Sequence, residues 1–461
     1  MARVLVTAND VISSRLAGPG IRCVELGRQL ALAGHDVTIV AVDSTPAAFP
    51  GLTVVGRQSQ SDIDALARNH DAVLVEGLSL VRYPSLRRAS IPIIVDLYDP
   101  FPLAILEQES HRAMSMRENS STSIRSALRD LLRCGDFFIC ASERQRDFWL
   151  GSLLEAGRIN PHTWDADNSL RKLIDVVPFG VSDLPPPIRH PQARARISPH
   201  LDERAIVLLW AGGIYNWFDP LSLIRSVARV HSEFPNIRLV FMSTTHPNQG
   251  VPERMWMPAR ARQLADQLGV LDTVVIFNDT WVPYEDRGDW LAAADCGVST
   301  HFDHAETRYA FRTRFLDYFW ARLPIICSDG DVLGELVRQR HLGWVVAPED
   351  ESGLVEAIRT FAQRGKEYEN MRIRVGEVAA QMTWSHVTQP LRAYCDDLML
   401  AADRPRTDSR LSHSERATHP IRAAAGLTLR GTQVIRREGL VAAVREAQRW
   451  WEVRRARKRK R

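Results

Sequence analysis

The sequence predicts an α/β protein made of two doubly wound, Rossmann-like domains that face a cleft, followed by a basic, partly helical tail. Three observations lead to this prediction. Short apolar segments alternate with helix-like segments along most of the chain. The alternation stops once, at the Pro-rich stretch DLPPPIRHPQ (183–192), and then starts again. The chain has 461 residues, and a single hydrophobic core rarely grows beyond roughly 250–300 residues.

The first half supplies five predicted strands, at residues 3–8, 37–42, 72–75, 93–95 and 137–140. Between the first two, residues 21–32 place apolar side chains at helical spacing, and a Gly-His pair at 34–35 indicates the helix end. Strands that are apolar throughout and alternate with helices are typical of a parallel sheet covered on both faces. Residues 1–184 are therefore predicted to form the first domain.

The second half repeats the pattern after a linker predicted at 185–204. Its strands are predicted at residues 205–210, 237–242, 273–277, 296–299 and 324–327, within a domain at 205–384. Residues 385–400 are predicted to form a closing helix that returns to the first domain. Residues 401–461 are predicted to be a partly flexible tail that is helical from about residue 421.

Composition and charge exclude several classes of protein. No apolar run approaches the ~18 residues of a membrane-spanning helix, and the first residues lack the pattern of a signal peptide. The six cysteines show no CxxC spacing, which argues against a zinc site or disulfide framework and favours the cytoplasm. Residues 421–461 hold 13 basic and three acidic residues, so this tail carries +10 and the rest of the chain −6. Such a tail suggests an anionic membrane surface. A solvated tail, or one that docks on the acidic remainder of the chain, is the alternative. Nucleic acid is not expected, because no nucleic-acid motif accompanies the tail.

Binding and catalytic residues are expected in the loops at the carboxyl ends of the predicted strands, because open α/β sheets bind ligands there. The first loop holds Gly18 and Gly20 before a helix whose N-terminal N–H groups could bind an anion, and Arg22 adds a positive charge. The loop could equally be a tight strand-to-helix connection. Cys23 breaks the GxGxxG spacing, which weakens a dinucleotide dehydrogenase, although Asp43 at the second strand end leaves that class open.

Two further loops carry polar groups or glycines. The loop after the strand at 93–95 holds Asp96, Tyr98 and Asp99, two acids and a phenol that could position a sugar or a proton. Asp99 before Pro100 is also an ordinary turn former. The loop after the first strand of the second domain holds Gly212 and Gly213, which allow the backbone to approach a phosphate.

The fourth loop, residues 299–324, is the richest in charge. Glu306 and Asp317 could bind sugar or ribose hydroxyls, and Arg314, on the same helix face as Asp317, could hold a diphosphate. A salt-bridged surface helix is the alternative, which the many aromatic residues of the segment disfavour. The neighbouring histidines are better explained as hydrogen-bonding groups than as metal ligands, so no metal site is expected.

Over about residues 1–400 the chain resembles the retaining GT-B glycosyltransferases of group 1, or family 4. Six segments occur in the order of that family: GPGIRCVELGRQLALAGHDVTIV, CASERQRDFW, IDVVPFGVSD, AGGIYNWFDPLSLIRSV, FNDTWVPYEDRGDWLAAADCGVST and RTRFLDYFWARLPII. The resemblance implies transfer of a sugar from a nucleotide-diphosphate donor to an acceptor hydroxyl, with retention and without a metal or other cofactor.

Combining the loops with the resemblance, we expect two groups of site residues. Donor binding is expected of Gly18, Gly20, Arg22, Gly180, Gly212, Gly213, Tyr284 and Asp317, and catalysis of Tyr98, Asp99, Glu306 and Arg314. Tyr98 replaces a first-domain histidine of the family, and Tyr309 stands at its first acidic position, where Glu306 or Asp303 could substitute. The family's second-domain lysine falls at Trp217 or Phe218, a loss for which Arg314 could compensate.

The expected partners are a nucleotide-sugar donor, a saccharide or lipid-linked acceptor, and an anionic membrane surface bound through residues 421–461. These partners suggest cell-surface polysaccharide or glycolipid synthesis by a cytoplasmic protein that is peripheral on the inner face of the membrane. Two alternatives stay open: a catalytically silent GT-B scaffold that binds partners through its tail, and a nonhydrolysing nucleotide-sugar epimerase, which the order of the motifs disfavours.

Overall fold

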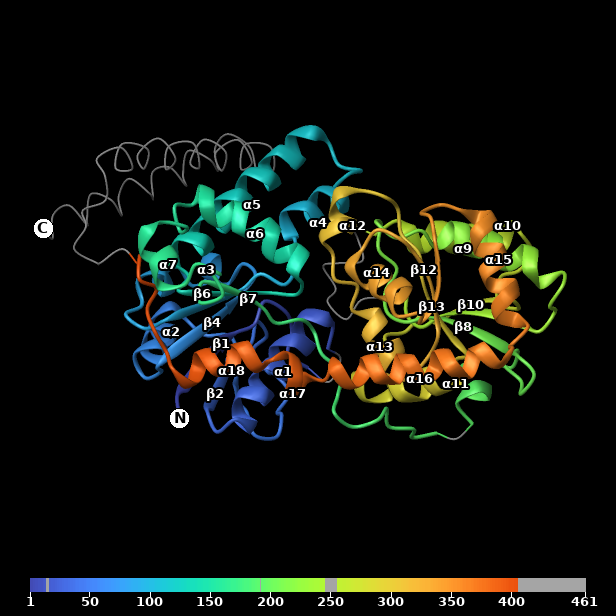
Figure 1. Cartoon of the computed structure of the whole chain (residues 1–461), viewed down its shortest axis with the longest axis horizontal. Coiled ribbons are helices and arrows are strands. Elements are labelled where there is room, and N and C mark those ends of the chain that lie inside the picture. The colour runs from blue at the N-terminus through green and yellow to red at the C-terminus, as the bar shows by residue number, and fades with distance from the viewer. Residues whose placement is uncertain (14–15, 191, 245–254, 405–461) are drawn as a thin grey trace, which may run out of the picture. The chain divides into compact units, whose positions relative to one another are not determined.

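The computed structural model describes residues 1–13, 16–190, 192–244 and 255–404 (Figure 1). The basic tail predicted at 401–461, including its helix from 421, therefore lies outside the described residues from 405 onward. Among the described residues, no helix is both long and apolar enough to cross a membrane.

The first domain is a parallel sheet of seven strands in the order β3-β2-β1-β4-β5-β6-β7. The strands are β1 (Arg3–Thr7), β2 (Asp36–Val40), β3 (Thr53–Val55), β4 (Ala72–Glu76), β5 (Ile93–Asp96), β6 (Phe137–Cys140) and β7 (Ile174–Val176). The helices are α1 (Gly18–Leu32), α2 (Gln60–Arg68), α3 (Ser79–Arg82), α4 (Phe101–Gln108), α5 (Met114–Cys134), α6 (Glu143–Glu155) and α7 (Pro161–Ala166), with a 3₁₀ turn at Pro84–Arg88.

The second domain is a parallel sheet of six strands in the order β10-β9-β8-β11-β12-β13, the doubly wound order in which the direction of winding reverses next to the first strand. The strands are β8 (Ile206–Trp210), β9 (Ile237–Phe241), β10 (Val275–Phe277), β11 (Cys296–Ser299), β12 (Ile325–Ser328) and β13 (Gly343–Val346). The helices are α8 (Ala193–Ile197), α9 (Pro220–His231), α10 (Met257–Gln267), α11 (Arg287–Ala293), α12 (Ala305–Tyr309), α13 (Arg314–Trp320), α14 (Val332–Gln339), α15 (Glu351–Ala362) and α16 (Lys366–Gln381), with a 3₁₀ turn at Tyr284–Asp286.

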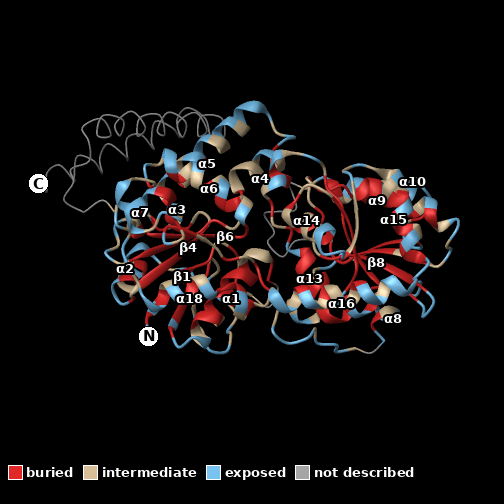
Figure 2. Cartoon of the chain, in the orientation of Figure 1, coloured by how far each residue is buried: buried red, intermediate tan, exposed pale blue. Residues whose placement is uncertain are grey.

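The burial pattern explains why these segments form strands. All five residues of β4 and all five of β8 are buried, as expected for central strands covered by helices on both faces. Figure 2 shows buried residues concentrated in the two sheets and on the inward faces of the surrounding helices. All ten predicted strands are present. The strands β3, β7 and β13, which the sequence pattern missed, lie at sheet edges and are partly exposed, so they lack a long apolar run.

The chain crosses between the domains twice, and the two crossings are hydrogen-bonded to each other. The amide of Val181 donates to the carbonyl of Met382 at 2.8 Å, and the amide of Trp384 donates to the carbonyl of Val181 at 2.9 Å. Gly180 permits this approach, because a Cβ there would lie 2.7 Å from backbone atoms of Trp384. The two crossings are thus joined directly through their backbones.

The return to the first domain differs from the single helix predicted at 385–400. Two short helices, α17 (Trp384–Val387) and α18 (Gln389–Asp396), pack against α1. The chain then continues on the first domain, where the amide of Ala401 donates to Asp136 at 2.9 Å and Asp403 pairs with Arg158 at 2.8 Å. The closing segment thus extends to Arg404, beyond the predicted start of the tail.

Candidate active site in the interdomain cleft

A cavity of about 460 Å³ lies between the carboxyl ends of the two sheets, within the size range of small-molecule sites. Its first-domain wall includes Asn9, Gly18, Glu76, Asp96, Tyr98 and Asp99. Its second-domain wall includes Gly212, Gly213, Tyr284, Glu306, Arg314 and Asp317. Ten of the twelve residues expected from the sequence line the cavity, and Gly20 and Arg22 do not.

Arg22 is fully buried below the cavity and does not face the cleft. Its guanidinium makes a two-pronged ion pair with Asp96, at 2.6 and 2.9 Å, and also donates to the carbonyl of Val177 at 2.9 Å. The rings of Tyr98 and Phe179 lie 5.1 and 4.9 Å from it. The structure therefore places Arg22 as a support for Asp96 and Tyr98, and the direct contact with a donor expected for it does not fit this position.

Gly20 is buried in the first turn of α1. A Cβ on Gly20 would lie 3.0 Å from both the side chain of Leu16 and the carbonyl of Val11, so the glycine allows the preceding loop to pack closely. Gly18, in contrast, lines the cavity, and a Cβ there would meet nothing within 4 Å. The N-terminus of α1 thus faces the cleft at Gly18, where a helix dipole favours an anion.

The loop after β8 forms a cradle with Arg314. Gly212 has a φ of +91°, a conformation that favours glycine. The carbonyl of Gly213 accepts a hydrogen bond from Nη2 of Arg314 at 2.9 Å, and the guanidinium carbon lies 4.2 and 4.0 Å from the rings of Trp210 and Phe218. Its buried Nη1 has no hydrogen-bond partner among the described residues.

Burial lowers the pKa of Arg314 to about 10, so this side chain still carries its positive charge at neutral pH. A cation with an unpaired donor beside a glycine turn is suited to a phosphate group. The cradle therefore has the chemistry expected of the site that holds a diphosphate.

Asp317 lies on α13, one turn after Arg314, and lines the same cavity. Its Oδ2 is 3.3 Å from Nη1 of Arg287, and Arg287 lies under the ring of Tyr284 at 5.4 Å. Burial raises the pKa of Asp317, and the charges of Arg287 and Arg314 oppose this effect. Arg287 thus holds the carboxylate in the wall of the same cavity as Arg314.

Two carboxylates, Asp99 and Glu306, meet the cavity from opposite domains. Glu306 is held by Arg312 through two bonds, at 3.0 and 2.6 Å. Asp99 has no hydrogen bond or ion pair among the described residues. Burial and the charge of Glu306 raise the pKa of Asp99 to about 7, and Arg312 opposes the shift. One carboxylate is therefore paired, and the other can exchange a proton near neutral pH.

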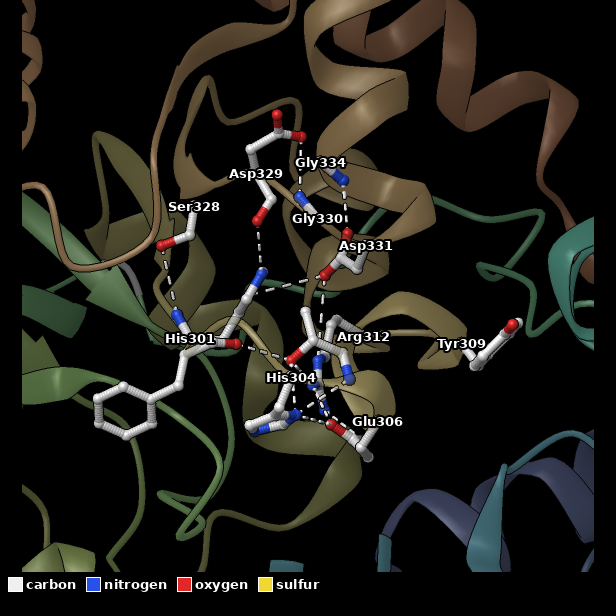
Figure 3. A network of polar contacts seen from close by, with 12 residues as sticks. His301, His304, Glu306, Tyr309, Arg312, Ser328, Asp329, Gly330, Asp331 and Gly334 are labelled. Carbon is white, nitrogen blue, oxygen red and sulfur yellow. Dashed lines mark hydrogen bonds and ion pairs between the residues drawn. The ribbon is translucent and has the colours of Figure 1, made fainter. Parts of the chain in front are cut away.

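A buried polar network holds Arg312 in place (Figure 3). Nε of Arg312 lies 3.9 Å from Asp331, whose other oxygen accepts the amide of Gly334 at 2.6 Å at the start of α14. His301 lies 3.9 Å from Asp331 through Nδ1, and its Nε2 bonds the carbonyl of Asp329 at 3.0 Å. Burial lowers the pKa of His301 to about 3, so the ring is neutral. The network behaves as a structural support, in agreement with the hydrogen-bonding role expected for this histidine.

The departures from the family pattern have clear places in the structure. Figure 3 shows Tyr309 turned away from the network, and its ring packs 4.8 Å from that of Phe148 on α6. Asp303 is exposed, whereas Glu306 lines the cavity. Of the two acids that could replace the missing one, only Glu306 is positioned to do so. The carbonyls of Tyr309 and Tyr98 both accept from Nε2 of Gln145, at 2.9 and 2.8 Å, which ties the two domains together at the cavity.

Several cavity residues were not identified from the sequence. Glu76 ends β4 and Arg287 begins α11, and both line the cavity. Glu76 could have been predicted, because it directly follows the predicted strand at 72–75, just as Asp96 follows the predicted strand at 93–95. Arg287 had no such signal, since its partner Asp317 is 30 residues away in the sequence.

Among the described residues, no group of three His, Cys, Asp or Glu side chains could hold a metal ion. Asp329 and Asp331 have the DxD spacing seen in some metal sites, but both have other roles: Asp331 caps α14 and Asp329 pairs with Arg338. Independence from a metal stays a prediction.

Comparison with known proteins agrees with this geometry. Residues 205–364 match the family model described as group 1 glycosyl transferases. A D-inositol 3-phosphate glycosyltransferase of Streptomyces coelicolor is 28% identical over 229 residues, which are 49% of this chain and 47% of the relative. The chain thus aligns with about half the length of this curated relative.

Solved structures resemble the chain over a larger part. A sucrose-phosphate synthase from Thermosynechococcus elongatus has a TM-score of 0.60 at 15% identity and covers 85% of this chain and 97% of its own. Anabaena HepE, solved with UDP and glucose, has a TM-score of 0.61 at 14% identity and covers 86% of this chain and all of its own. At such identities the likeness shows the fold. The chain therefore has the two-domain GT-B fold, and its second domain carries the sequence pattern of the group 1 glycosyltransferases.

Proposed function

We propose that this protein transfers a sugar from a nucleoside-diphosphate sugar to an acceptor hydroxyl, with retention of the anomeric configuration. The observation that carries the proposal is the buried guanidinium of Arg314, whose unpaired Nη1 lies beside the Gly212–Gly213 turn in the cavity. The match of residues 205–364 to the group 1 family adds support, as does the name of the Streptomyces relative.

In this proposal the second domain binds the leaving nucleotide. Charge develops on the diphosphate as the glycosidic bond breaks, and Arg314 with the N–H groups of the glycine turn stabilises it. The N-terminus of α1 at Gly18 faces the same cavity and adds a favourable dipole. Asp317, oriented by Arg287, accepts hydrogen bonds from ribose, and Tyr284 lies beside the base.

The carboxylates that meet across the cleft act on the sugar and the acceptor. Glu306, fixed by Arg312, supplies a negative charge where the sugar becomes electron-poor in the transition state. Asp99, with its pKa near 7, takes up the proton of the acceptor hydroxyl. Tyr98 forms part of the wall that holds the acceptor in line with the donor.

A nucleotide-binding titration with matched variants tests the proposal. Calorimetry with UDP, GDP, ADP and dTDP and their glucose conjugates should give one preferred donor. Loss of the charged hydrogen bonds in Arg314→Ala costs about 1.5–3 kcal/mol, or roughly 10- to 150-fold in affinity. Asp317→Asn should weaken binding in the same direction.

The control variant is Asp279→Asn, because Asp279 is exposed, contacts Arg262 and Thr244 and does not line the cavity. It should bind the donor as the wild type does. Absence of binding by any nucleotide to folded wild-type protein would favour the silent scaffold instead.

We also propose that the acceptor belongs to cell-surface polysaccharide or glycolipid synthesis at the inner face of a membrane. The support is the charge of +10 on residues 421–461, which favours an anionic surface. The full chain should co-sediment with vesicles containing phosphatidylglycerol, and a chain ending at Arg404 should not. Equal sedimentation of both would argue against a membrane role for the tail.

A further inference from the structure

The acceptor side of the cavity contains more acid than its neighbouring cations balance. Glu76 and Asp96 end the adjacent strands β4 and β5 and are paired in the sheet register. Asp99 follows three residues later, and all three side chains line the cavity. Because the strands are parallel, their carboxyl ends bring these groups to one edge of the sheet.

Two of the carboxyl groups on this side have no direct ion-pair partner among the described residues. Asp96 is neutralised by Arg22, whereas neither Glu76 nor Asp99 makes an ion pair among the described residues. Arg82, the basic residue of α3, does not pair with either of them: its guanidinium donates to the carbonyl of Ala8 at 3.0 Å.

Glu76 is 3% exposed, and only one of its two carboxylate oxygens has a hydrogen-bond partner among the described residues. Its Oε2 accepts the amide of Asn9 at 3.3 Å, and its buried Oε1 has no hydrogen-bond partner among the described residues. Burial and the neighbouring charges of Asp96 and Asp10 raise the pKa of Glu76 to about 8, and Arg22 opposes the shift. A buried carboxyl group without a partner is costly unless a ligand completes it.

The other wall of the acceptor side is apolar. Phe101, Ala104 and Ile105 of α4, with Ile124 of α5, line the cavity. None of the α4 residues is fully buried, so the helix presents apolar surface to the cleft that a ligand can cover. These apolar side chains carry no atoms that bind a metal ion. Among the described residues there is also no group of three His, Cys, Asp or Glu side chains that could hold one.

We propose that the acceptor is a saccharide or cyclitol that carries a protonated amine next to its reacting hydroxyl, with Glu76 as the residue that binds the ammonium group. This inference rests on the proposed glycosyl transfer and names its acceptor class. An ammonium group gives Glu76 the ion-pair partner that it lacks, which favours its ionised form, and donates to the unpartnered Oε1 of Glu76. A phosphorylated acceptor would bring a further anion to the unpaired carboxyl groups of Glu76 and Asp99 and is disfavoured.

Matched acceptor probes test the proposal on the full chain saturated with its preferred nucleoside diphosphate. The first set is glucosamine, glucose and glucose 6-phosphate, and the second is 2-deoxystreptamine with scyllo-inositol and inositol 1-phosphate. In at least one set, calorimetry should show the amine binding at least about tenfold more tightly than its neutral analogue, with the phosphate weakest; tenfold corresponds to about 1.4 kcal/mol.

Variants assign the preference to Glu76. Glu76→Gln keeps the shape of the side chain and should abolish the amine preference. The affinity for the nucleoside diphosphate should stay within about twofold of wild type, since Glu76 belongs to the first-domain wall of the cavity and Arg314 and Asp317 to the second-domain wall. Glu109→Gln is the control, because Glu109 is also buried with an unpartnered oxygen and does not line the cavity. It should keep the preference.

Three outcomes would overturn the inference: a neutral or phosphorylated probe that binds best in both sets, no amine preference in either set, or an amine preference that survives in Glu76→Gln. Failure of the proposed function itself is recognised separately, because the wild type would then bind no nucleoside diphosphate before any acceptor is added.

Discussion

Replacing Asp99 with asparagine should stabilise the protein above neutral pH and lower its activity. Burial and the charge of Glu306 raise the pKa of Asp99 from 3.8 to about 7. A tenfold change in proton affinity corresponds to about 1.4 kcal/mol, so the raised pKa sets an upper limit of ~4 kcal/mol. Asp99 is partly exposed, and solvent screening reduces the expected effect to about 2 kcal/mol.

The sign of the effect follows from proton binding. Because Asp99 keeps its proton to a higher pH in the folded protein than in the unfolded chain, the free energy of unfolding falls as pH rises from about 4 to about 7. Asparagine has no proton to lose. The stability gain of Asp99→Asn should therefore be small near pH 4, grow through pH 7 and stay constant above it.

Thermal unfolding between pH 5 and pH 8 measures this gain. For a domain of about 190 residues, about 2 kcal/mol corresponds to a rise in Tm of roughly 4–8 °C at pH 8. Asp279→Asn should show no such pH-dependent gain, and sugar transfer by Asp99→Asn should fall by about 100-fold or more if Asp99 takes up the acceptor proton. A gain that is equal at both pH values, or a loss of stability at pH 8, would refute the electrostatic reasoning.

Three further substitutions test the support of the cleft by thermal or urea unfolding. Gly180→Ala should destabilise the paired crossings by about 1–3 kcal/mol, because its Cβ would lie 2.7 Å from the backbone of Trp384; an unchanged Tm would show that the crossings adjust freely. Arg22→Met should cost about 3–5 kcal/mol by leaving Asp96 charged and unpaired, and a neutral result would mean that Asp96 takes up a proton. Tyr318→Phe should cost about 1–3 kcal/mol, because the buried amide of Ala211 loses its acceptor at 3.0 Å; wild-type stability would indicate a substitute partner.

The fold was predictable because its central strands are apolar along their whole length. All residues of AVLVE in β4 and of IVLLW in β8 are buried. Such apolar runs between helices are typical of a parallel sheet covered on both faces. The edge strand β13, with four half-buried residues, carries no comparable signal. Edge strands owe their conformation to pairing with a neighbour far away in the sequence, which a local pattern does not reveal.

The sequence predicts which loops line the cavity, but it predicts the role of each side chain in those loops less well. Arg22 follows a glycine loop, a position that suggests an anion ligand, yet the turn of α1 directs it inward to Asp96, 74 residues away. The choice between Asp303 and Glu306 depended on where α12 begins. His304 caps that helix, and Glu306 in its first turn is thereby held in the wall of the cavity.

The central claim is retaining sugar transfer from a nucleotide donor stabilised by Arg314. Proton NMR of the reaction with the preferred nucleotide sugar measures it most directly, since the spectrum reports both release of the nucleoside diphosphate and the anomer of the first product. The account predicts a product with the anomeric configuration of the donor, and a rate about 100- to 1,000-fold lower in Arg314→Ala, as for loss of a donor to a developing anion. An inverted product, or an unchanged rate in Arg314→Ala, would contradict it.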